Sequence, residues 1–400
     1  MILLVKITVL GGGVIGLCSA YYLVKKGHSV TVVDAAQGVG KGASYGNGGQ
    51  LSYGLSDPLG KPVLLKKIPS IFLNADSAIK FKHPINLRTV KWGLKFLREC
   101  SASRHKKNTL DLLSLALESK KLLESMLQDI EDDFLYVKRS KIVLYEDEES
   151  LANEVSFLPQ KLENGSDNVL LSFSEAADLE PAIRSLKSDI KGAILSEQDE
   201  VGDSFIFCQN LFKWLQNNNT QFKFNRPVQK LAIWKNKVTG YFSEENFYQT
   251  DLIVSCLGSF TDTLIKHSTP VLPVKGYSLT LNPGKKEFSR SITLADKRIL
   301  FTRLGEKVRI TGFADFVGLS NYKEKERLDL LISLSQEIAP DLADYNSGQL
   351  TSWSGFRPLT PSSFPIIGPS SKEGLYINSG QGFYGWTLAC ASGHRLANFF

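Results

Sequence analysis

The chain has 400 residues, of which 42% are hydrophobic and 22% are charged, and its formal net charge is +6. This composition is typical of a globular protein of about two domains, and it excludes the fibrous and intrinsically disordered classes. The five cysteines and five histidines are scattered, with no CxxC pair and no metal-ligand spacing. They argue against a disulfide framework and against a metal site, and we expect the cysteines to be buried thiols.

The first predicted element is a buried strand. Met1–Leu10 is apolar except for Lys6, and it leads directly into glycines without a small-residue cleavage site. A strand over Lys6–Leu10 therefore fits better than a signal peptide. No later apolar run approaches the roughly 18 residues of a membrane-spanning helix, so we expect a cytoplasmic protein.

A dinucleotide-binding pattern follows this strand. Gly11–Gly16 fits G-x-G-x-x-G, a helical pattern covers Leu17–Lys26, and Gly27 stands where a helix terminator is expected. A second strand, Ser29–Val33, ends at Asp34, eighteen residues beyond the last glycine of the motif. Glycines in this strand, helix, strand and acid context are far more specific than an isolated glycine turn.

Each residue of the motif has a physical role in binding a dinucleotide. Gly11 allows the tight turn, Gly13 lets the backbone approach a pyrophosphate, and Gly16 lets the helix pack closely on the strand. The phosphates then meet free N–H groups at the positive end of the helix dipole. Asp34 is placed to accept hydrogen bonds from an adenosine ribose.

The next segment favours FAD over a nicotinamide cofactor. A nicotinamide enzyme usually continues into further regular βα units, whereas here a glycine-dense run, Gly38–Gly49, leads into Gln50–Ser52. Glycine at this density allows the backbone to approach a large ring such as a flavin. The alternative is a flexible surface loop.

The C-terminal part supplies a second set of glycine turns. Trp353–Pro358 and Phe364–Pro369 precede a strand over Gly374–Asn378, and Gly380–Thr387 then leads into a helical pattern over Leu388–Ala397. A glycine turn before a helix N-terminus suits the N1–C2=O edge of a flavin, where negative charge accumulates on reduction. A purely structural turn is the alternative.

Five segments together resemble the bacterial D-amino-acid dehydrogenases, the FAD-dependent family also called the small subunit, which is related to glycine and sarcosine oxidases. The segments are Asn47–Ser52, Gly202–Asp203, Pro273–Ser278, Trp353–Pro361 and Gly385–Cys390. The similarity covers nearly the whole chain. It departs from the family pattern at two places: Gln381 stands where histidine is frequent, and Arg303 stands where proline is frequent. An arginine at the second place is similar to the substrate-carboxylate arginine of glycine oxidases.

The resemblance implies an α/β (α+β) fold of the D-amino-acid oxidase type. A Rossmann-like FAD-binding domain would comprise residues 1–60, 200–270 and 345–400, and a mainly antiparallel-sheet substrate domain residues 61–199 and 271–344. The expected strands of the substrate domain are Gly276–Leu281, Ser291–Leu294, Leu300–Arg303 and Val308–Phe313, and the expected helices are Leu110–Ile130 and Tyr322–Ala339. A strand meander, Gln221–Val228, Lys237–Phe242 and Asp251–Gly258, would return to the FAD-binding domain.

The same resemblance, with the motifs above, predicts noncovalently bound FAD and no metal. The expected cofactor-binding residues are Gly11, Gly13, Val14, Ile15, Gly16, Asp34, Ala35, Ser44, Asn47, Gly48, Gly49, Gln50, Leu51, Val228, Gly258, Arg357, Gly380, Gln381, Gly382, Gly385, Trp386 and Thr387. Val228 is expected near the adenine.

The implied reaction is the oxidative deamination of a D-amino acid. A hydride passes from Cα to flavin N5, water hydrolyses the imino acid to a 2-oxo acid and ammonia, and a quinone or other respiratory acceptor takes the electrons. No protein base is required if the amine enters neutral. A guanidinium binds the carboxylate bidentately, and Arg303 and Arg357 are the candidates, with Tyr277 and Tyr53 as hydroxyl partners. Arg303 as a surface residue, Arg357 as a brace of the flavin loop, and the tyrosines as wall residues are the alternatives.

Three other functions remain open at this point. They are a glycine- or sarcosine-type oxidase that uses oxygen, a D-proline or hydroxyproline dehydrogenase, and a noncatalytic flavin-binding protein of the membrane surface.

A basic stretch indicates whether the protein can dock to the membrane that contains a quinone acceptor. Lys61–Lys107 contains twelve basic and two acidic residues, a net charge of +10. Its interleaved apolar residues are Leu64, Leu65, Ile68, Ile71, Phe72, Phe81, Trp92, Leu94, Phe96 and Leu97. This pattern suits docking to an anionic membrane, here the inner face of the cell membrane, although a solvated face over core residues is the alternative. No nucleic-acid-binding module is recognisable, so we expect no nucleic-acid partner.

Overall fold

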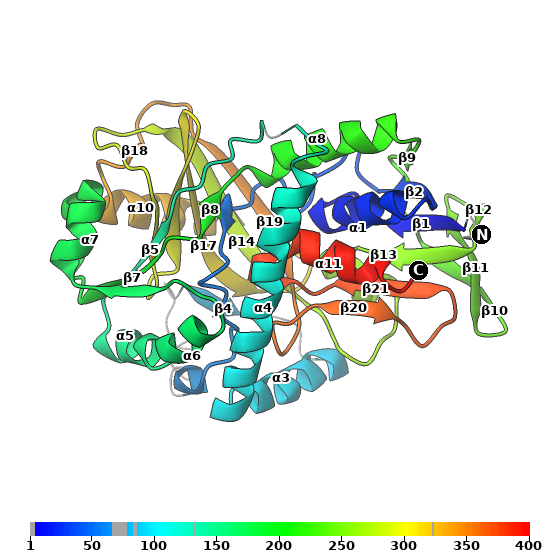
Figure 1. Ribbon diagram of the computed structural model, residues 1–400, viewed down its shortest axis with the longest axis horizontal. Coiled ribbons are helices and arrows are strands. Elements are labelled where there is room, and N and C mark those ends of the chain that lie inside the picture. The colour runs from blue at the N-terminus through cyan, green and yellow to red at the C-terminus, as the bar shows by residue number, and fades with distance from the viewer. Residues whose placement is uncertain (1–4, 66–77, 83–85, 132, 322–323) are drawn as a thin grey trace.

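Two large sheets with separate hydrophobic cores build the chain (Figure 1). The computed structural model describes residues 5–65, 78–82, 86–131, 133–321 and 324–400. The fold class predicted from the sequence is confirmed, because one sheet is mainly parallel with helices on one face and the other is mainly antiparallel.

The first sheet has six strands in the order β20-β21-β13-β1-β2-β9. All neighbours are parallel except β20, which pairs antiparallel with β21. The strands are β1 (Lys6–Leu10), β2 (Ser29–Val33), β9 (Gln221–Lys223), β13 (Leu252–Ser255), β20 (Ile366–Pro369) and β21 (Leu375–Ser379). The first two have the bounds expected from the sequence.

Helices cover one face of this sheet and a small meander covers the other. The helices are α1 (Val14–Lys25), α4 (Ala102–Met126), α8 (Ser204–Asn217) and α11 (Ala389–Ala397), and their buried side chains, such as Leu17, Leu112, Leu211 and Leu396, share one core. The meander is β10 (Lys230–Trp234), β11 (Lys237–Ser243) and β12 (Asn246–Gln249). Its Leu231 packs with buried residues of β1, β2 and β13.

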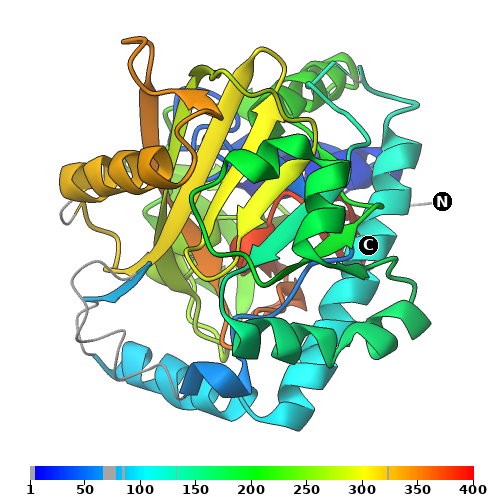
Figure 2. The same ribbon diagram turned by 90° about the vertical axis from the view of Figure 1, so that its left-hand side faces the viewer.

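The second sheet has ten strands, and its central part follows the order β18-β14-β17-β16-β15-β5-β7-β6. The strands are β4 (Ile79–Phe81), β5 (Lys141–Tyr145), β6 (Val169–Leu171), β7 (Gly192–Ser196), β14 (Leu272–Pro283), β15 (Ser291–Leu294), β16 (Ile299–Leu304), β17 (Lys307–Phe316), β18 (Ala343–Asp344) and β19 (Thr351–Leu359). Helices α7 (Phe173–Leu179) and α10 (Glu324–Ile338) pack on one face, where α10 lies on the outside of the sheet (Figure 2). The opposite face is turned toward the first sheet.

The remaining elements lie between the strands and helices of the two bodies or within one of them. They are β3 (Gln50–Leu51), β8 (Glu200–Val201), α3 (Leu87–Glu99), α5 (Glu148–Val155), α6 (Leu158–Glu163), α9 (Thr261–Leu264) and the 3₁₀ helices η1 (Pro181–Ser185), η2 (Gly258–Phe260) and η3 (Gly382–Tyr384). The β3–β8 pairing joins the glycine-rich loop of the first body to the end of the second.

Three expectations from the sequence need correction. Gln221–Val228 and Asp251–Gly258 are not meander strands, because β9 and β13 pair parallel within the first sheet. The segment Thr351–Leu359 pairs along β14 in the second sheet, although the predicted boundaries placed it in the FAD-binding domain. Conversely, helix α4 was expected in the substrate domain, but its leucines pack into the core formed with α1 and α11. In Figure 1 it crosses the molecule between the two halves.

Two further observations concern cysteines and membrane helices. All five cysteines are buried, as expected from their scattered positions. None of the helices in the described part of the chain is long and apolar enough to cross a membrane.

Candidate functional site

A cavity of about 730 Å³ opens where the strand order reverses in the first sheet. The carboxyl ends of β1, β2 and β13 meet there, and Leu10, Val33 and Cys256 line it. Ligands of open α/β sheets bind at this type of switch point. The cavity continues between the two sheets and reaches strands β5, β14 and β19 of the second one.

The nucleotide end of the cavity is a preformed turn. The Asp34 carboxylate accepts hydrogen bonds from the backbone N–H groups of Gly12 (2.6 Å) and Ala36 (2.7 Å). The Ser44 hydroxyl accepts from the N–H of Val14 at 3.1 Å, at the first residue of α1. A carboxylate has about four acceptor positions, so Asp34 can hold the turn and still accept from a ribose hydroxyl.

Most of the expected cofactor residues come together in the wall of this one cavity. They are Gly11, Gly13, Val14, Ile15, Asp34, Ala35, Ser44, Asn47, Gly48, Gln50, Val228, Gly258, Arg357, Gln381, Gly382, Gly385, Trp386 and Thr387. Gly16, Gly49, Leu51 and Gly380 do not line it. Of these, Gly16 packs α1 on the β1 turn and Leu51 belongs to the β3–β8 pair, so both support the wall from behind.

Unused polar atoms in the wall fit a large polar cofactor. The Gln381 side-chain oxygen and the Ser259 hydroxyl are buried and have no hydrogen-bond partner among the described residues. Buried polar atoms normally have a partner, so a bound group is expected to supply one here. The volume also lies within the range of about 300–1,000 Å³ typical of cofactor sites. These residues fit FAD, and the N-terminus of α1 would hold the pyrophosphate.

Arg309 braces the glycine-rich loop, a role that the sequence did not reveal. Its guanidinium donates to the carbonyl of Asn47 at 2.6 Å and to the Thr280 hydroxyl at 2.7 Å, and it lies 3.4 Å from the Asp203 carboxylate. Asp203 in turn caps the N-terminus of α8. The resemblance had marked Asp203, but the arginine lies more than a hundred residues away and no local pattern points to it.

The far end of the cavity contains Arg357. Its guanidinium donates to the carbonyl of Phe313 at 2.9 Å and lies 5.3 Å from the centre of the Phe383 ring. A Cβ atom on Gly276 would lie 2.2 Å from the same guanidinium, so this glycine on the neighbouring strand makes room for it. Burial lowers the pKa of Arg357 to about 10, and the group stays charged at neutral pH. No carboxylate among the described residues forms an ion pair with it.

The hydroxyls of the two tyrosines expected near the substrate donate to protein carboxylates. Tyr277 lines the cavity, but its hydroxyl donates to Asp315 at 2.9 Å, so its ring is a wall. Tyr53 is fully buried outside the cavity and its hydroxyl donates to Glu200 at 3.2 Å. Tyr53 is therefore withdrawn as a substrate partner, and Tyr384, whose hydroxyl contacts the backbone of Asp57, lines the cavity instead.

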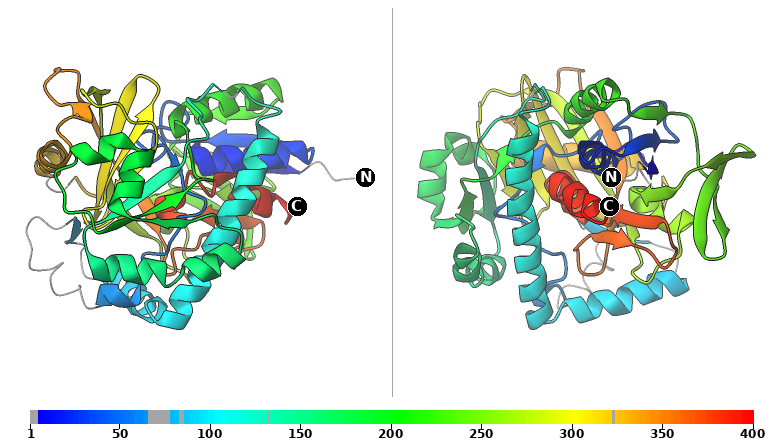
Figure 3. Two further views of the ribbon diagram at one scale, coloured as in Figure 1. Left: turned by 60° about the vertical axis from the view of Figure 1, so that its left-hand side comes forward. Right: turned by 45° about the vertical axis from the view of Figure 1, so that its right-hand side comes forward.

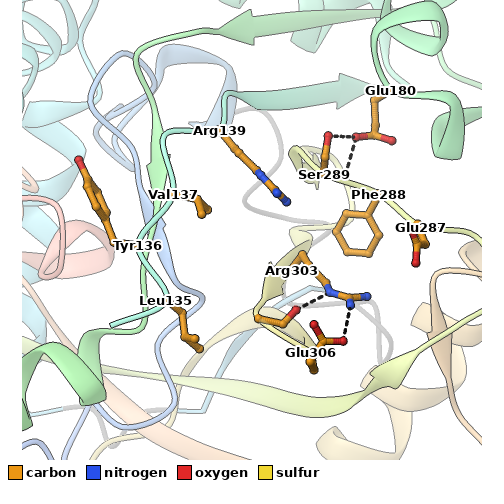
Figure 4. Close-up of a pocket in the computed structure, with 11 residues that line it drawn as sticks. Leu135, Tyr136, Val137, Arg139, Glu180, Glu287, Phe288, Ser289, Arg303 and Glu306 are labelled. Atoms are coloured by element: carbon orange, nitrogen blue, oxygen red, sulfur yellow. Dashed lines mark hydrogen bonds and ion pairs between the residues drawn. The ribbon is translucent and has the colours of Figure 1, made fainter. Parts of the chain in front are cut away.

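Arg303 is the second correction in the site. It lines a separate pocket of about 570 Å³, where its guanidinium donates to the Gly305 carbonyl (2.6 Å) and to Glu306 (3.2 Å) (Figure 4). The reason is the alternation of side chains along β16: Leu300 faces the cavity, so a residue three positions later faces away from it.

Two more residues line the far end of the cavity and were not predicted from the sequence. Lys141 and Ser52 both line the cavity, and the lysine ammonium donates to the serine hydroxyl at 3.0 Å. Ser52 also donates its backbone N–H to the Thr387 hydroxyl at 2.9 Å. Lys141 belongs to a strand that is distant in sequence from every glycine motif, and only the pairing of β5 with β15 brings it to the site.

Comparison with known proteins agrees with this geometry. Residues 6–399 match the family described as FAD dependent oxidoreductase. The D-amino acid dehydrogenase of Vibrio cholerae serotype O1 is 31% identical over 400 residues, which cover 99% of this chain and 94% of that protein. D-amino acid dehydrogenase 2 of Ralstonia nicotianae is 32% identical over 406 residues, which cover 98% of this chain and 96% of that protein.

Solved structures show the same fold at lower identity. Glycine oxidase from Bacillus cereus ATCC 14579 has a TM-score of 0.72 at 18% identity, covering 99% of this chain and 94% of that one. The FAD-bound L-alpha-glycerophosphate oxidase of Mycoplasma pneumoniae has a TM-score of 0.73 at 17% identity, covering 98% and 93%. With the family match and the relatives above 30% identity, the chain belongs to the FAD dependent oxidoreductases.

Proposed function

We propose that the protein oxidises a D-amino acid to the corresponding 2-oxo acid and ammonia and passes the electrons to a respiratory quinone. The observation that carries this proposal is Arg357, a guanidinium without a carboxylate partner among the described residues, in the wall of the cavity beyond the dinucleotide site. A guanidinium fork is matched to a carboxylate, which every amino acid has. The names of the two curated relatives support the D configuration.

The chain supplies position and charge to the reaction. FAD, when bound, accepts a hydride from the carbon that carries the amine. Arg357 holds the substrate carboxylate, and the rings of Tyr277 and Phe383 form walls that limit access of water. Among the described residues that line the cavity, Asp34 is the only carboxylate and there is no histidine. Asp34 lies at the nucleotide end, so the amine enters neutral and water later hydrolyses the imino acid.

The electron acceptor separates a dehydrogenase from an oxidase. Under air, with a D-amino acid as substrate, we expect the reduction of a soluble ubiquinone analogue to exceed peroxide formation by at least about tenfold, a difference of roughly 1.4 kcal/mol in barrier. Both products are measured in the same reaction, with enzyme lacking substrate as the blank. Peroxide formation that matches substrate consumption would instead identify an oxidase of the glycine or sarcosine type.

An exposed face of α3 supports docking to the inner face of the cell membrane. Leu87, Val90, Leu94 and Leu97 have the spacing of one helix face, and they are 85%, 45%, 66% and 47% exposed. The opposite face is anchored, because Trp92 and its neighbour Phe96 are buried, as part of the core. The helix lies at the edge of the molecule (Figure 3).

Basic side chains lie beside this leucine stripe, but not every lysine of the basic stretch is available for docking. Lys91 and Arg98 are exposed beside the leucine stripe, the arrangement of an interfacial helix on anionic lipid. Lys95 instead donates to the carbonyl of Ser268 at 2.9 Å. Lys66, Lys67, Ile68, Ile71 and Phe72, which belong to the same predicted stretch, lie outside the described residues.

Cosedimentation with phosphatidylglycerol vesicles tests this face. A variant with Leu94→Glu and Leu97→Glu should bind roughly 30-fold more weakly, because two added negative charges near the surface cost about 2 kcal/mol before the lost apolar contact is counted. The matched control is Trp234→Glu with Phe247→Glu, which places the same charges on exposed apolar residues of the meander (69% and 50% exposed). Equal binding of both variants and wild type, at low and high salt, would exclude α3 as the docking face.

A further inference from the structure

Lys141 is a buried cation at the far end of the cavity. It begins β5, whose five residues are all buried, and its own exposed fraction is 7%. Side chains alternate along a strand, and Ile142 and Leu144 point into the core beneath α7 and α10. Lys141 therefore points to the opposite face of the sheet, where it lines the cavity and contacts Ser52.

Lys141 differs from the other buried cations in its hydrogen-bond partners. Besides Lys141, the buried lysines and arginines of the described chain are Lys161, Lys275 and Arg327. Each of these three has a carboxylate partner: Lys161 has Glu154 at 2.6 Å, Lys275 has Glu324 at 2.6 Å, and Arg327 has Asp315 at 2.8 Å.

Lys141 has only the Ser52 hydroxyl at 3.0 Å, and no carboxylate of the described residues lies within ion-pair distance. A buried ammonium is costly unless it is paired.

Two nearby carboxylates, Asp199 and Asp57, lie close enough to act on Lys141 electrostatically, but neither forms an ion pair with it. Asp199 Oδ1 accepts the backbone N–H groups of Tyr53 and Gly54, both at 2.8 Å, and the hydroxyl of Ser196 at 3.0 Å, while its Oδ2 has no hydrogen-bond partner among the described residues. Asp57 is held by Lys161 at 2.8 Å. An ammonium has three N–H donors, and Ser52 takes one of them. Because Lys141 lines the cavity, a bound carboxylate there can accept from the remaining donors.

We propose that Lys141 binds a carboxylate of the substrate, as a second cation beside Arg357. This inference rests on the proposed function, in which the substrate is an amino acid. The carboxylate has two sources: the α-carboxylate of any amino acid, shared between both cations, or the side chain of an acidic amino acid, with Arg357 on the α-carboxylate. In the second case the preferred substrates are acidic amino acids, because a neutral substrate leaves the buried ammonium unpaired.

Carboxylate binding to the FAD-loaded protein tests the proposal without turnover. The change in flavin absorbance gives dissociation constants for propionate, which has one carboxylate, and for glutarate, which has two. Lys141→Met should weaken binding of one or both by at least about tenfold, since a hydrogen bond to a charged group contributes about 1.5–3 kcal/mol. Lys141→Arg keeps the charge and should retain most of the affinity.

The pattern of loss assigns the source. Weaker binding of both ligands places Lys141 on the α-carboxylate, and weaker binding of glutarate alone places it on the side chain. The control is Lys275→Met, which removes a buried lysine whose partner, Glu324, does not line the cavity; it should leave both dissociation constants unchanged. Equal affinities of wild type and of flavin-replete Lys141→Met for both ligands would overturn the proposal.

The proposed function can fail separately from this inference. If no D-amino acid reduces the flavin of the wild type, the proposed substrate class is wrong whatever the carboxylate affinities are. If D-amino acids are oxidised but Lys141→Met binds both carboxylates like wild type, only the role of Lys141 is wrong.

Discussion

Gly16→Ala is expected to weaken FAD binding. A Cβ atom at this position would lie 1.8 Å from the carbonyl oxygen of Gly11 and 3.0 Å from its carbonyl carbon. Both are backbone atoms of the turn that would hold the pyrophosphate, so α1 would have to move away from β1 and carry its N-terminus away from the phosphates. Overpacking of this kind costs about 1–3 kcal/mol, or roughly 5- to 150-fold in affinity. Flavin content after dialysis gives the measurement.

Gly93→Ala provides the matched control for this experiment. Gly93 lies in α3, and a Cβ atom there has no neighbouring atom within 4 Å. This variant should retain flavin like wild type, while thermal melts with and without added FAD show whether the Gly16 variant is folded. Full flavin occupancy of Gly16→Ala would mean that the cofactor does not depend on the packing of α1 against this turn.

Arg357→Leu is expected to lower kcat/KM for the amino acid by roughly 30- to several-thousand-fold, because loss of one partner of a buried charge pair costs about 2–5 kcal/mol. Arg357→Lys should fall between this variant and wild type, since it keeps the charge but loses the planar fork. Steady-state kinetics and flavin content are measured together, which separates loss of substrate binding from loss of cofactor.

Arg303→Leu is the control for the Arg357 variants. Its guanidinium lies in the second pocket, bonded to Gly305 and Glu306, and its removal should leave kcat/KM unchanged. A large loss on replacing Arg303, with none on replacing Arg357, would reverse the assignment of the carboxylate site. Loss of flavin from Arg357→Leu would reassign this arginine to cofactor support.

The parts of the fold that depend on local patterns were predictable. The β1–α1–β2 unit has its glycines, helix and acid within about thirty residues, and the structure has both strands at the expected bounds. Strands β14 to β17 were expected near their observed positions from the family resemblance, and they are mostly buried on both faces rather than alternating. The β1–α1–β2 unit contains the signals for its own formation, so its local sequence pattern alone reveals it.

The far end of the cavity was predicted less well, because it is built by pairing between distant strands. Arg303 and Arg357 have the same chemistry in sequence, and only the side-chain alternation of β16 and the placement of β19 beside β14 separate them. Lys141 stands in an apolar strand without a motif, and its position at the site follows from the parallel pairing of β5 with β15. Sequence separation of this size removes any local signal.

Anaerobic reduction of the bound flavin by single amino acids tests directly whether the protein oxidises D-amino acids. The purified yellow protein is mixed under argon with each member of a panel of D-amino acids and with the matching L-enantiomers, and the visible flavin band is followed. We expect at least one D-amino acid to bleach the band, its L-enantiomer to leave the band unchanged, and Arg357→Leu to lose the response while it retains flavin. A flavin that no amino acid of either configuration reduces would contradict the proposed amino-acid oxidation.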